Sequence, residues 1–249
     1  MRALAVIAML CARVLSAQSA ATGQYNEANA LYRASDFDAA RQSYLEVAAT
    51  GVRDARLYYN LGNACFKSER LGEAILWYER ARRLAPHDED IEANLRFANL
   101  VKKDREPAGD RNALLRFVGA VYIWPSHDQL SVLFALSFLA LFALGVRRLR
   151  ARARRGAVWL TGILLTAGLS AVAAVWLGAR IYYQASISEA IVTAEKVLAR
   201  SGPDAGQTEV FIAHEGTKVR LVRQEGRWLL VRLANGLGGW IQAEAIERI

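Results

Sequence analysis

Cysteine and histidine are scarce in this chain of 249 residues, which contains two cysteines and three histidines. Cys11 lies in an N-terminal segment that we expect to be removed, so that only Cys65 remains and no internal disulfide can form. His87, His127 and His214 lie in three different segments, and the sequence contains no phosphate-binding loop, nucleophile elbow or metal-spaced His/Glu pair. The sequence therefore predicts a protein that is not an enzyme and that needs no metal and no cofactor.

Acidic residues are rare between residues 111 and 184, where one acidic side chain stands against nine basic ones. The net charge of +8 arises there, because residues 1–21, 22–110 and 185–249 carry +2, −2 and 0. Basic residues beside long apolar runs are typical of a membrane protein and not of a nucleic-acid-binding face. A composition of 53% apolar and 22% charged residues also excludes a fully disordered or collagen-like chain.

Residues 1–21 have the features of a secretory signal peptide. Arg2 is followed by an apolar run through Leu15 and then by small residues, and both Ala17-Gln18-Ser19 and Ser19-Ala20-Ala21 fit a small-x-small cleavage site. Because Arg13 interrupts the apolar run, an uncleaved anchor helix is the alternative.

Two later segments, Leu130 to Val146 and Ala157 to Leu177, contain no charged residue. At about 1.5 Å per residue they reach about 25 and 32 Å, which is close to the thickness of about 30 Å of a hydrocarbon core. We predict transmembrane helices at 127–146 and 157–178, and two buried helices of a soluble core are the alternative. On the second span, one face carries small residues that we expect to pack on the first span or on a partner's helix, namely Ala167, Ala171, Ala174 and Gly178.

The connector 147–156 between the two spans disfavours the soluble alternative because six of its ten residues are arginines. By the positive-inside rule this loop is cytoplasmic, and both outer ends of the hairpin face the other side, where the signal peptide also directs the N-terminal part. The sequence thus predicts a bacterial inner-membrane protein with two spans, in contact with lipids, and with extracytoplasmic N- and C-terminal domains. The arginines that set this topology are Arg147, Arg148, Arg150, Arg152, Arg154 and Arg155.

An internal repeat with a period of about 34 residues organises the N-terminal part, which we predict to be an all-α tetratricopeptide solenoid at 22–106. Residues with the spacing of the tetratricopeptide pattern are Leu61, Gly62, Ala74, Tyr78, Ala81 and Pro86. A degenerate repeat precedes them, and a capping helix without a second helix follows. We expect helices at about 22–34, 37–49, 55–68, 71–84 and 88–103. Two and a half repeats predict a marginal domain unless a partner or the membrane covers one end.

The first helix of each repeat lines the concave groove, where similar side chains recur at the spacing of the repeat. Aromatic rings, amides and one basic residue per repeat are what an extended peptide with an acidic group or a free carboxylate would need. The alternative is that these side chains support packing or are merely solvated, and we expect Cys65 to be a core residue. The candidate residues for binding a peptide or a protein partner are Tyr25, Asn26, Asn29, Tyr32, Arg33, Tyr59, Asn60, Asn63, Phe66 and Lys67.

Residues 190–249 change to short alternating runs separated by glycine-containing turns, which predicts a small all-β barrel of five or six strands. The order of Val197-Leu198-Ala199-Arg200, Ser201-Gly202-Pro203, Trp228 and Gly239-Trp240 resembles a bacterial SH3-like domain. This resemblance implies an envelope protein and peptidoglycan as one candidate ligand. We expect His214 to lie in a solvent-facing turn, and we expect three aromatic residues to lie in the barrel core, namely Phe211, Trp228 and Trp240.

The whole order, with linkers at 107–126 and 179–189, resembles the BatE-type proteins of the bacterial aerotolerance operon. The clearest matches are Tyr58-Tyr59-Asn60-Leu61-Gly62-Asn63-Ala64, Ala74-Ile75-Leu76-Trp77-Tyr78-Glu79-Arg80-Ala81 and Asp90-Ile91-Glu92-Ala93-Asn94-Leu95-Arg96-Phe97. That family is encoded beside membrane-anchored von Willebrand factor A domain proteins and a MoxR-type ATPase. The resemblance therefore implies a non-enzymatic envelope scaffold that binds membrane-anchored proteins, with no nucleic acid and no small-molecule substrate. A peptidoglycan-binding envelope sensor is the alternative function.

Overall fold

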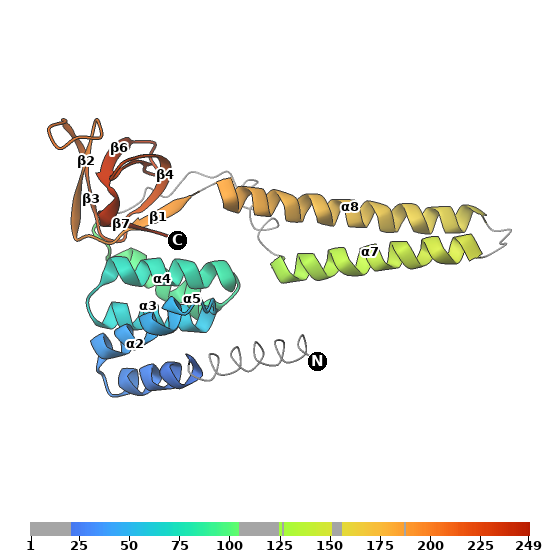
Figure 1. Cartoon of the computed structure of the whole chain (residues 1–249), viewed down its shortest axis with the longest axis horizontal. Helices are drawn as coiled ribbons and strands as arrows, with labels where there is room; N and C mark the ends of the chain where they lie inside the picture. The colour runs from blue at the N-terminus through green and yellow to red at the C-terminus, as the bar shows by residue number, and fades with distance from the viewer. Residues whose placement is uncertain (1–20, 105–124, 126, 151–155, 187) are drawn as a thin grey trace, which may run out of the picture. The chain divides into compact units, whose positions relative to one another are not determined.

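The computed structural model describes residues 21–104, 125, 127–150, 156–186 and 188–249 (Figure 1). The chain forms two compact units, the first from Met1–Ala108 with Ser188–Ile249 and the second from Gly109–Ile187. Residues 1–20 of the predicted signal peptide, nearly all of the 107–126 linker and three of the loop arginines lie outside the described residues; these arginines are Arg152, Arg154 and Arg155.

The N-terminal part of the first unit is helical, as the repeat pattern predicts. It consists of a first helix at residues 21–33 and of α2 (Phe37–Ala49), α3 (Ala55–Lys67), α4 (Leu71–Leu84) and α5 (Glu89–Val101). Each of these helices begins and ends within two residues of its predicted position. They form two helical hairpins followed by a single helix (Figure 1).

The local signals that begin and end these helices also recur from one repeat to the next. Asp54 and Asp88 cap α3 and α5, because each carboxylate accepts hydrogen bonds from two backbone N–H groups of the first turn. Ser35 and Glu69 follow the first helix of each hairpin with φ angles of +64° and +62°, a left-handed conformation that allows the chain to reverse. The geometry of the helix ends and turns therefore recurs from repeat to repeat, as the core residues do.

Small residues bring the helices of each hairpin close together. Ala40, Leu61, Ala74 and Cys65 are completely buried, which confirms that Cys65 is a core residue. A Cβ atom on Gly62 would lie 2.6 Å from the ring of Tyr78, so only glycine allows α3 and α4 to approach this closely.

The C-terminal part of the first unit is an antiparallel sheet, which we call the β-domain. Its strands are β1 (Glu189–Val192), β2 (Lys196–Arg200), β3 (Glu209–His214), β4 (Lys218–Glu225), β5 (Trp228–Arg232), β6 (Gly238–Gln242) and β7 (Ile246–Arg248), in the spatial order β3-β2-β6-β5-β4-β1-β7. A short 3₁₀ helix, η1 (Ala243–Ala245), precedes β7. The described residues thus hold seven strands, more than the expected five or six, because β1 and β7 are too short to show an alternating pattern.

The β-domain packs against α4. The backbone N–H of Gly72 donates a hydrogen bond to Glu215 Oε2 at 3.0 Å, and a Cβ atom on Gly72 would lie 2.8 Å from the carbonyl oxygen of Val192. Gly216, with a φ angle of +80°, lies against Ile75 on the same helix. Ile191 of β1 belongs to the buried core of the helices. The two modules are therefore one folded unit, although two long apolar helices separate them in the sequence.

Charged side chains surround this apolar contact. The side chain of Glu79 on α4 is only 8% exposed and lies 2.6 Å from the guanidinium of Arg82 and 3.6 Å from Lys218 Nζ of β4. Two further pairs across the contact are Arg80 with Glu247 at 2.8 Å and Arg83 with Glu189 at 3.2 Å. Because each buried carboxylate has a cationic partner, the contact avoids the cost of an unpaired charge.

The second unit consists of α7 (His127–Arg150) and α8 (Gly156–Ser186), packed side by side. By length and composition, both are apolar enough to cross a membrane, over Gln129–Arg148 and Trp159–Tyr182. Residues 147–150 are helical instead of belonging to the predicted loop, and residues 179–186 are helical instead of belonging to the predicted linker. Neither stretch contains a glycine or a proline, so nothing in the sequence ends the helices earlier.

Of the two contacts expected for the small-residue face of α8, packing on the first span is wrong, and packing on a partner's helix stays a prediction. Ala171, Ala174 and Gly178 are exposed, whereas Ala173 is buried and Ser170 donates a hydrogen bond of 2.9 Å to Ser137 of α7. Small residues occur on both faces of α8, so their spacing alone does not identify the face that packs. The buried serine pair identifies the packed face, because a hydroxyl in an apolar environment needs a hydrogen-bond partner.

Candidate functional site

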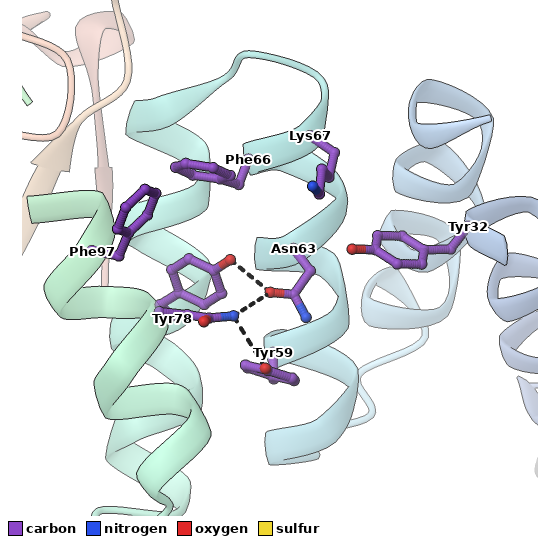
Figure 2. Close-up of a pocket in the computed structure, with 8 residues that line it drawn as sticks. Tyr32, Tyr59, Asn63, Phe66, Lys67, Tyr78 and Phe97 are labelled. Carbon is purple, nitrogen blue, oxygen red and sulfur yellow. Dashed lines mark hydrogen bonds between the residues drawn. The ribbon is translucent and has the colours of Figure 1, made fainter. Parts of the chain in front are cut away.

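A cavity of about 320 Å³ opens among the helices of the first unit (Figure 2). Four helices contribute to it, namely the first helix, α3, α4 and α5. Its lining residues are Tyr32, Tyr59, Asn63, Phe66, Lys67, Tyr78, Asn94 and Phe97. Five of them, from Tyr32 to Lys67, are among the ten binding residues predicted from the sequence.

Asn63 lies at the centre of a hydrogen-bond network in this pocket. Its Oδ1 accepts from Tyr78 Oη at 2.7 Å and from Asn94 Nδ2 at 2.8 Å. Asn94 Nδ2 also donates to Tyr59 Oη at 3.1 Å, and Figure 2 shows all three bonds as dashed lines. The amide oxygen of Asn63 is therefore fully used, while its amide nitrogen has no partner in the described part of the chain and remains free to donate to a ligand.

The same network occurs one repeat earlier. Tyr44 Oη donates to Asn29 Oδ1 at 2.7 Å, and Asn60 Nδ2 donates to Tyr25 Oη at 2.8 Å and to Asn29 Oδ1 at 3.3 Å. Three of the predicted binding residues, Tyr25, Asn29 and Asn60, thus connect one repeat to the next. Each network joins consecutive repeats through a tyrosine, two amides and a second tyrosine.

The last two predicted binding residues, Asn26 and Arg33, are exposed and do not line the pocket. Asn26 occupies the position of Asn60 and Asn94, but it belongs to the first helix, and in the described residues no earlier repeat lies before it. It therefore has none of the contacts that fix the other two amides.

The chemistry of the pocket is neutral apart from one cation. Burial, and secondarily the phenol of Tyr59, raises the pKa of Tyr32, and the same two causes raise the pKa of Tyr78. Both phenols therefore stay protonated and can donate hydrogen bonds at neutral pH. Among the lining residues, Lys67 is the only charged side chain, and none is a histidine, a cysteine or a carboxylate. The pocket thus suits binding through hydrogen bonds, aromatic contact and one positive charge.

Sequence reasoning missed three lining residues, namely Tyr78, Asn94 and Phe97. The repeat pattern assigns Tyr78 to packing, and it does pack, but its hydroxyl also faces the pocket. Asn94 and Phe97 lie one repeat after Asn60 and Asn63. Extending the comparison of groove positions to α5 would have found both of them.

His214 does not face solvent as expected, because Asp104 holds it. Its side chain is 17% exposed; its backbone N–H and ring Nδ1 lie 2.7 and 2.8 Å from the two carboxylate oxygens of Asp104. Thr217 Oγ1 donates to the same carboxylate at 2.8 Å. Burial alone would raise the pKa of Asp104, but these hydrogen bonds outweigh burial and lower it. Asp104 thereby fixes the end of the helical region to the turn between β3 and β4.

The β-domain offers few aromatic side chains to a ligand. Trp228 and Trp240 are buried and Phe211 packs against the sheet core, as expected. The guanidinium of Arg223 lies 5.2 Å from the ring centroid of Trp240. In the described residues of the whole chain, no group of three His, Cys, Asp or Glu side chains is placed to hold a metal ion.

Comparison with protein families finds two matches. Residues 25–89 match the tetratricopeptide repeat family, and residues 193–247 match the bacterial SH3 domain family. A search of curated proteins gave no match. The chain therefore contains a tetratricopeptide region and a bacterial SH3 domain, modules that mediate protein–protein interactions and are typical of adaptors without enzymatic activity.

Proposed function

We propose that this protein is a non-enzymatic adaptor of the bacterial envelope that binds a segment of a membrane-anchored partner in the groove of its tetratricopeptide region. The pocket of Figure 2 is the observation that carries the proposal. It combines aromatic walls, a free amide donor on Asn63 and the cation of Lys67, and its lining residues include no nucleophile activated by a base.

The arrangement of the chain supports a membrane hairpin with both domains on one side. The first unit is formed by residues before and after the two long helices, so both ends of the hairpin must emerge on the same side of a membrane. Two spans meet this condition, whereas one or three would not. The arginines of the 147–156 connector favour a cytoplasmic position for that loop. This position favours insertion in the inner membrane, with the first unit outside the cytoplasm.

The order of the parts supports a more specific assignment. It resembles that of BatE-type proteins, so the proposed partners are the membrane-anchored von Willebrand factor A domain proteins of an aerotolerance-type complex that includes a MoxR-type ATPase. The match of the β-domain to bacterial SH3 domains favours a second function, the binding of peptidoglycan by that domain. However, β1 and the β3–β4 turn already contact α4 and Asp104, which leaves less of the sheet for a ligand.

Site-specific photo-cross-linking in cells tests the groove. The full chain carries a photoreactive phenylalanine analogue at Phe66 in the pocket or, as a control, at Gln42, which is exposed on α2. We expect position 66 alone to form a cross-link to a membrane protein, and we expect Lys67→Glu to reduce it. Equal cross-linking from both positions would contradict the groove assignment. Sedimentation of the full chain with purified peptidoglycan tests the second function.

A further inference from the structure

The third groove helix breaks the repeated pattern of polar and basic residues. The first two groove helices carry an asparagine at one position, Asn29 and Asn63, and a basic residue four positions later, Arg33 and Lys67. At the equivalent positions, and at the position equivalent to Phe66, α5 carries apolar side chains, namely Phe97, Val101 and Leu100.

These apolar side chains are not needed for the core of the helical region. Phe97, Leu100 and Val101 are 55%, 67% and 51% exposed, whereas the core contacts of α5 are made by Ile91, Leu95 and Ala98. The rings of Phe97 and Phe66 are in edge contact, with centroids 5.7 Å apart. A second apolar face on one short helix, exposed and beside a pocket, is typical of a binding surface.

The opposite side of the pocket is basic and uncompensated. Figure 2 shows Lys67 and Tyr32 on one side of the pocket and Phe66 and Phe97 on the other. In the described part of the chain, neither Lys67 nor Arg33 has a carboxylate within ion-pair distance. By contrast, several arginines of α2 and α4 are paired with carboxylates, namely Arg41, Arg80, Arg82 and Arg83.

We infer that the groove recognises a two-part motif in a partner peptide: a bulky apolar side chain that packs against Phe66 and Phe97, and a carboxylate that lies beside Lys67. This inference rests on the proposed function and names the chemistry of its ligand. Charge complementarity requires the acidic group on the Lys67 side, and the exposed rings require the apolar group on the α5 side. A volume of about 320 Å³ holds one or two side chains, so the remaining peptide follows the surface of the groove.

The Asn63 amide nitrogen lies between these two subsites in the pocket (Figure 2). Because its oxygen is fixed by Tyr78 and Asn94, the amide cannot rotate without losing both bonds. The nitrogen is therefore held as a donor for a carbonyl group of the peptide backbone.

Selection from a random-peptide display library tests the motif, with the full chain in lipid nanodiscs as bait and empty nanodiscs as background. We expect the enriched peptides to share a large apolar residue beside one or two acidic residues. When the bait carries Lys67→Glu, the preference of the enriched peptides for acidic residues should disappear. When the bait carries Phe97→Ser, their preference for large apolar residues should disappear. Arg53→Glu is the matched control, because Arg53 is exposed and lies outside the pocket, and it should leave the consensus unchanged.

Synthetic versions of the best peptide measure how much each variant weakens binding. They also show whether the carboxylate belongs to a side chain or to the C-terminus of the peptide. We expect Phe97→Ser and Lys67→Glu each to weaken its binding about tenfold, as is typical of a central aromatic contact and of a reversed charge pair. Amidation of the peptide's C-terminus should leave binding unchanged, and replacement of its acidic side chains by amides should weaken it; the reverse result would overturn the assignment of a side-chain carboxylate. Leu100→Ser is a second variant if Phe97→Ser unfolds.

The possible failures are distinguishable. If no peptide is enriched above empty nanodiscs, the proposed groove function itself fails. If peptides are enriched but carry a neutral or basic consensus that survives Lys67→Glu and Phe97→Ser, the groove binds and the two-part motif is wrong. If the chain without peptide has twice its expected mass and Phe97→Ser restores the single mass, a second copy occupies the apolar side, which also overturns the inference.

Discussion

Gly72→Ala is expected to separate the β-domain from α4. Gly72 lies in the first turn of α4, and the added methyl group would lie 2.8 Å from the carbonyl oxygen of Val192 and 3.1 Å from Cβ of Glu215. Both distances are shorter than normal contacts, and the first partner is a backbone atom of β1 that cannot rotate away. The β-domain must therefore move outward by several tenths of an ångström.

The magnitude follows from three contributions to the free energy of unfolding. Overpacking of this kind costs about 1–3 kcal/mol. The movement also breaks the hydrogen bond of 3.0 Å from the Gly72 N–H to the Glu215 carboxylate, which is worth about 1.5–3 kcal/mol because the acceptor is charged. Alanine is a better helix former than glycine by about 1 kcal/mol, which offsets part of the loss. We expect a net destabilisation of roughly 1.5–5 kcal/mol for the contact.

Hydrogen–deuterium exchange of the full chain in nanodiscs measures this contact directly. The backbone N–H of residue 72 donates across the contact to the Glu215 carboxylate at 3.0 Å, so its exchange reports opening there. A loss of about 2 kcal/mol or more corresponds to exchange about thirtyfold faster, or more, where local opening controls it. Gly23→Ala is the control, because Gly23 is helical with open space around its Cβ position, and it should leave this exchange unchanged.

The reasoning is refuted if Gly72→Ala behaves like Gly23→Ala. Unchanged exchange at residue 72, together with an unchanged or higher melting temperature, would mean that α4 and β1 do not touch in solution. The helical region and the β-domain would then be two independent modules joined only through the hairpin.

Three further results are expected. In the wild type, the lowered pKa of Asp104 means that its hydrogen bonds contribute stability at pH values above its unfolded pKa of about 4, and that this contribution is lost as the pH falls through the lower folded pKa. Asp104→Asn should therefore flatten the acid side of a plot of melting temperature against pH. An unchanged plot would contradict this role. Ala173→Leu should weaken the packing of α7 on α8, measured by the yield of an α7–α8 cross-link, whereas Ala171→Leu should leave that yield unchanged; equal effects would mean that the packed face is misassigned. Glu69→Gly should stabilise the helical region by about 0.5–1 kcal/mol in thermal unfolding, because glycine relieves the left-handed strain, and a loss of stability would contradict that view.

The helical region could be read from the sequence because its determinants are local and repeated. Asp54 and Asp88 mark helix starts, Ser35 and Glu69 lie at the reversals, and Gly62 marks a close approach, all within the span of a single repeat pattern. The alternating runs separated by glycine-containing turns that the sequence shows after residue 190 correspond to strands such as β3 to β6. The short strands β1 and β7 carry no such pattern; β1 lies between β4 and β7, and β7 is an edge strand that pairs with β1.

The candidate site was predicted only in part because side chains at equivalent groove positions have different roles in different repeats. Tyr25 and Tyr59 have the same residue type and the same place in the repeat, yet the phenol of Tyr25 lies outside the pocket and that of Tyr59 lines it. The difference comes from α5, which closes one side of the pocket with Phe97. The sequence identifies this wall only when the comparison of groove positions is extended to α5, the third groove helix.

The contact between the β-domain and α4 explains how a solenoid of two and a half repeats completes its core. A repeat buries its apolar face only against a neighbour, and α4 has no complete third helical hairpin to cover it. Ile191 of β1 is fully buried in the core of the helices, and Ile249 packs against the same core. Burial of an isoleucine side chain is worth roughly 1.5–3 kcal/mol, a large share of the stability of a domain of this size. Because these residues follow the hairpin in the sequence, the helical region obtains its full core only when the chain after α8 returns to the same side as α4.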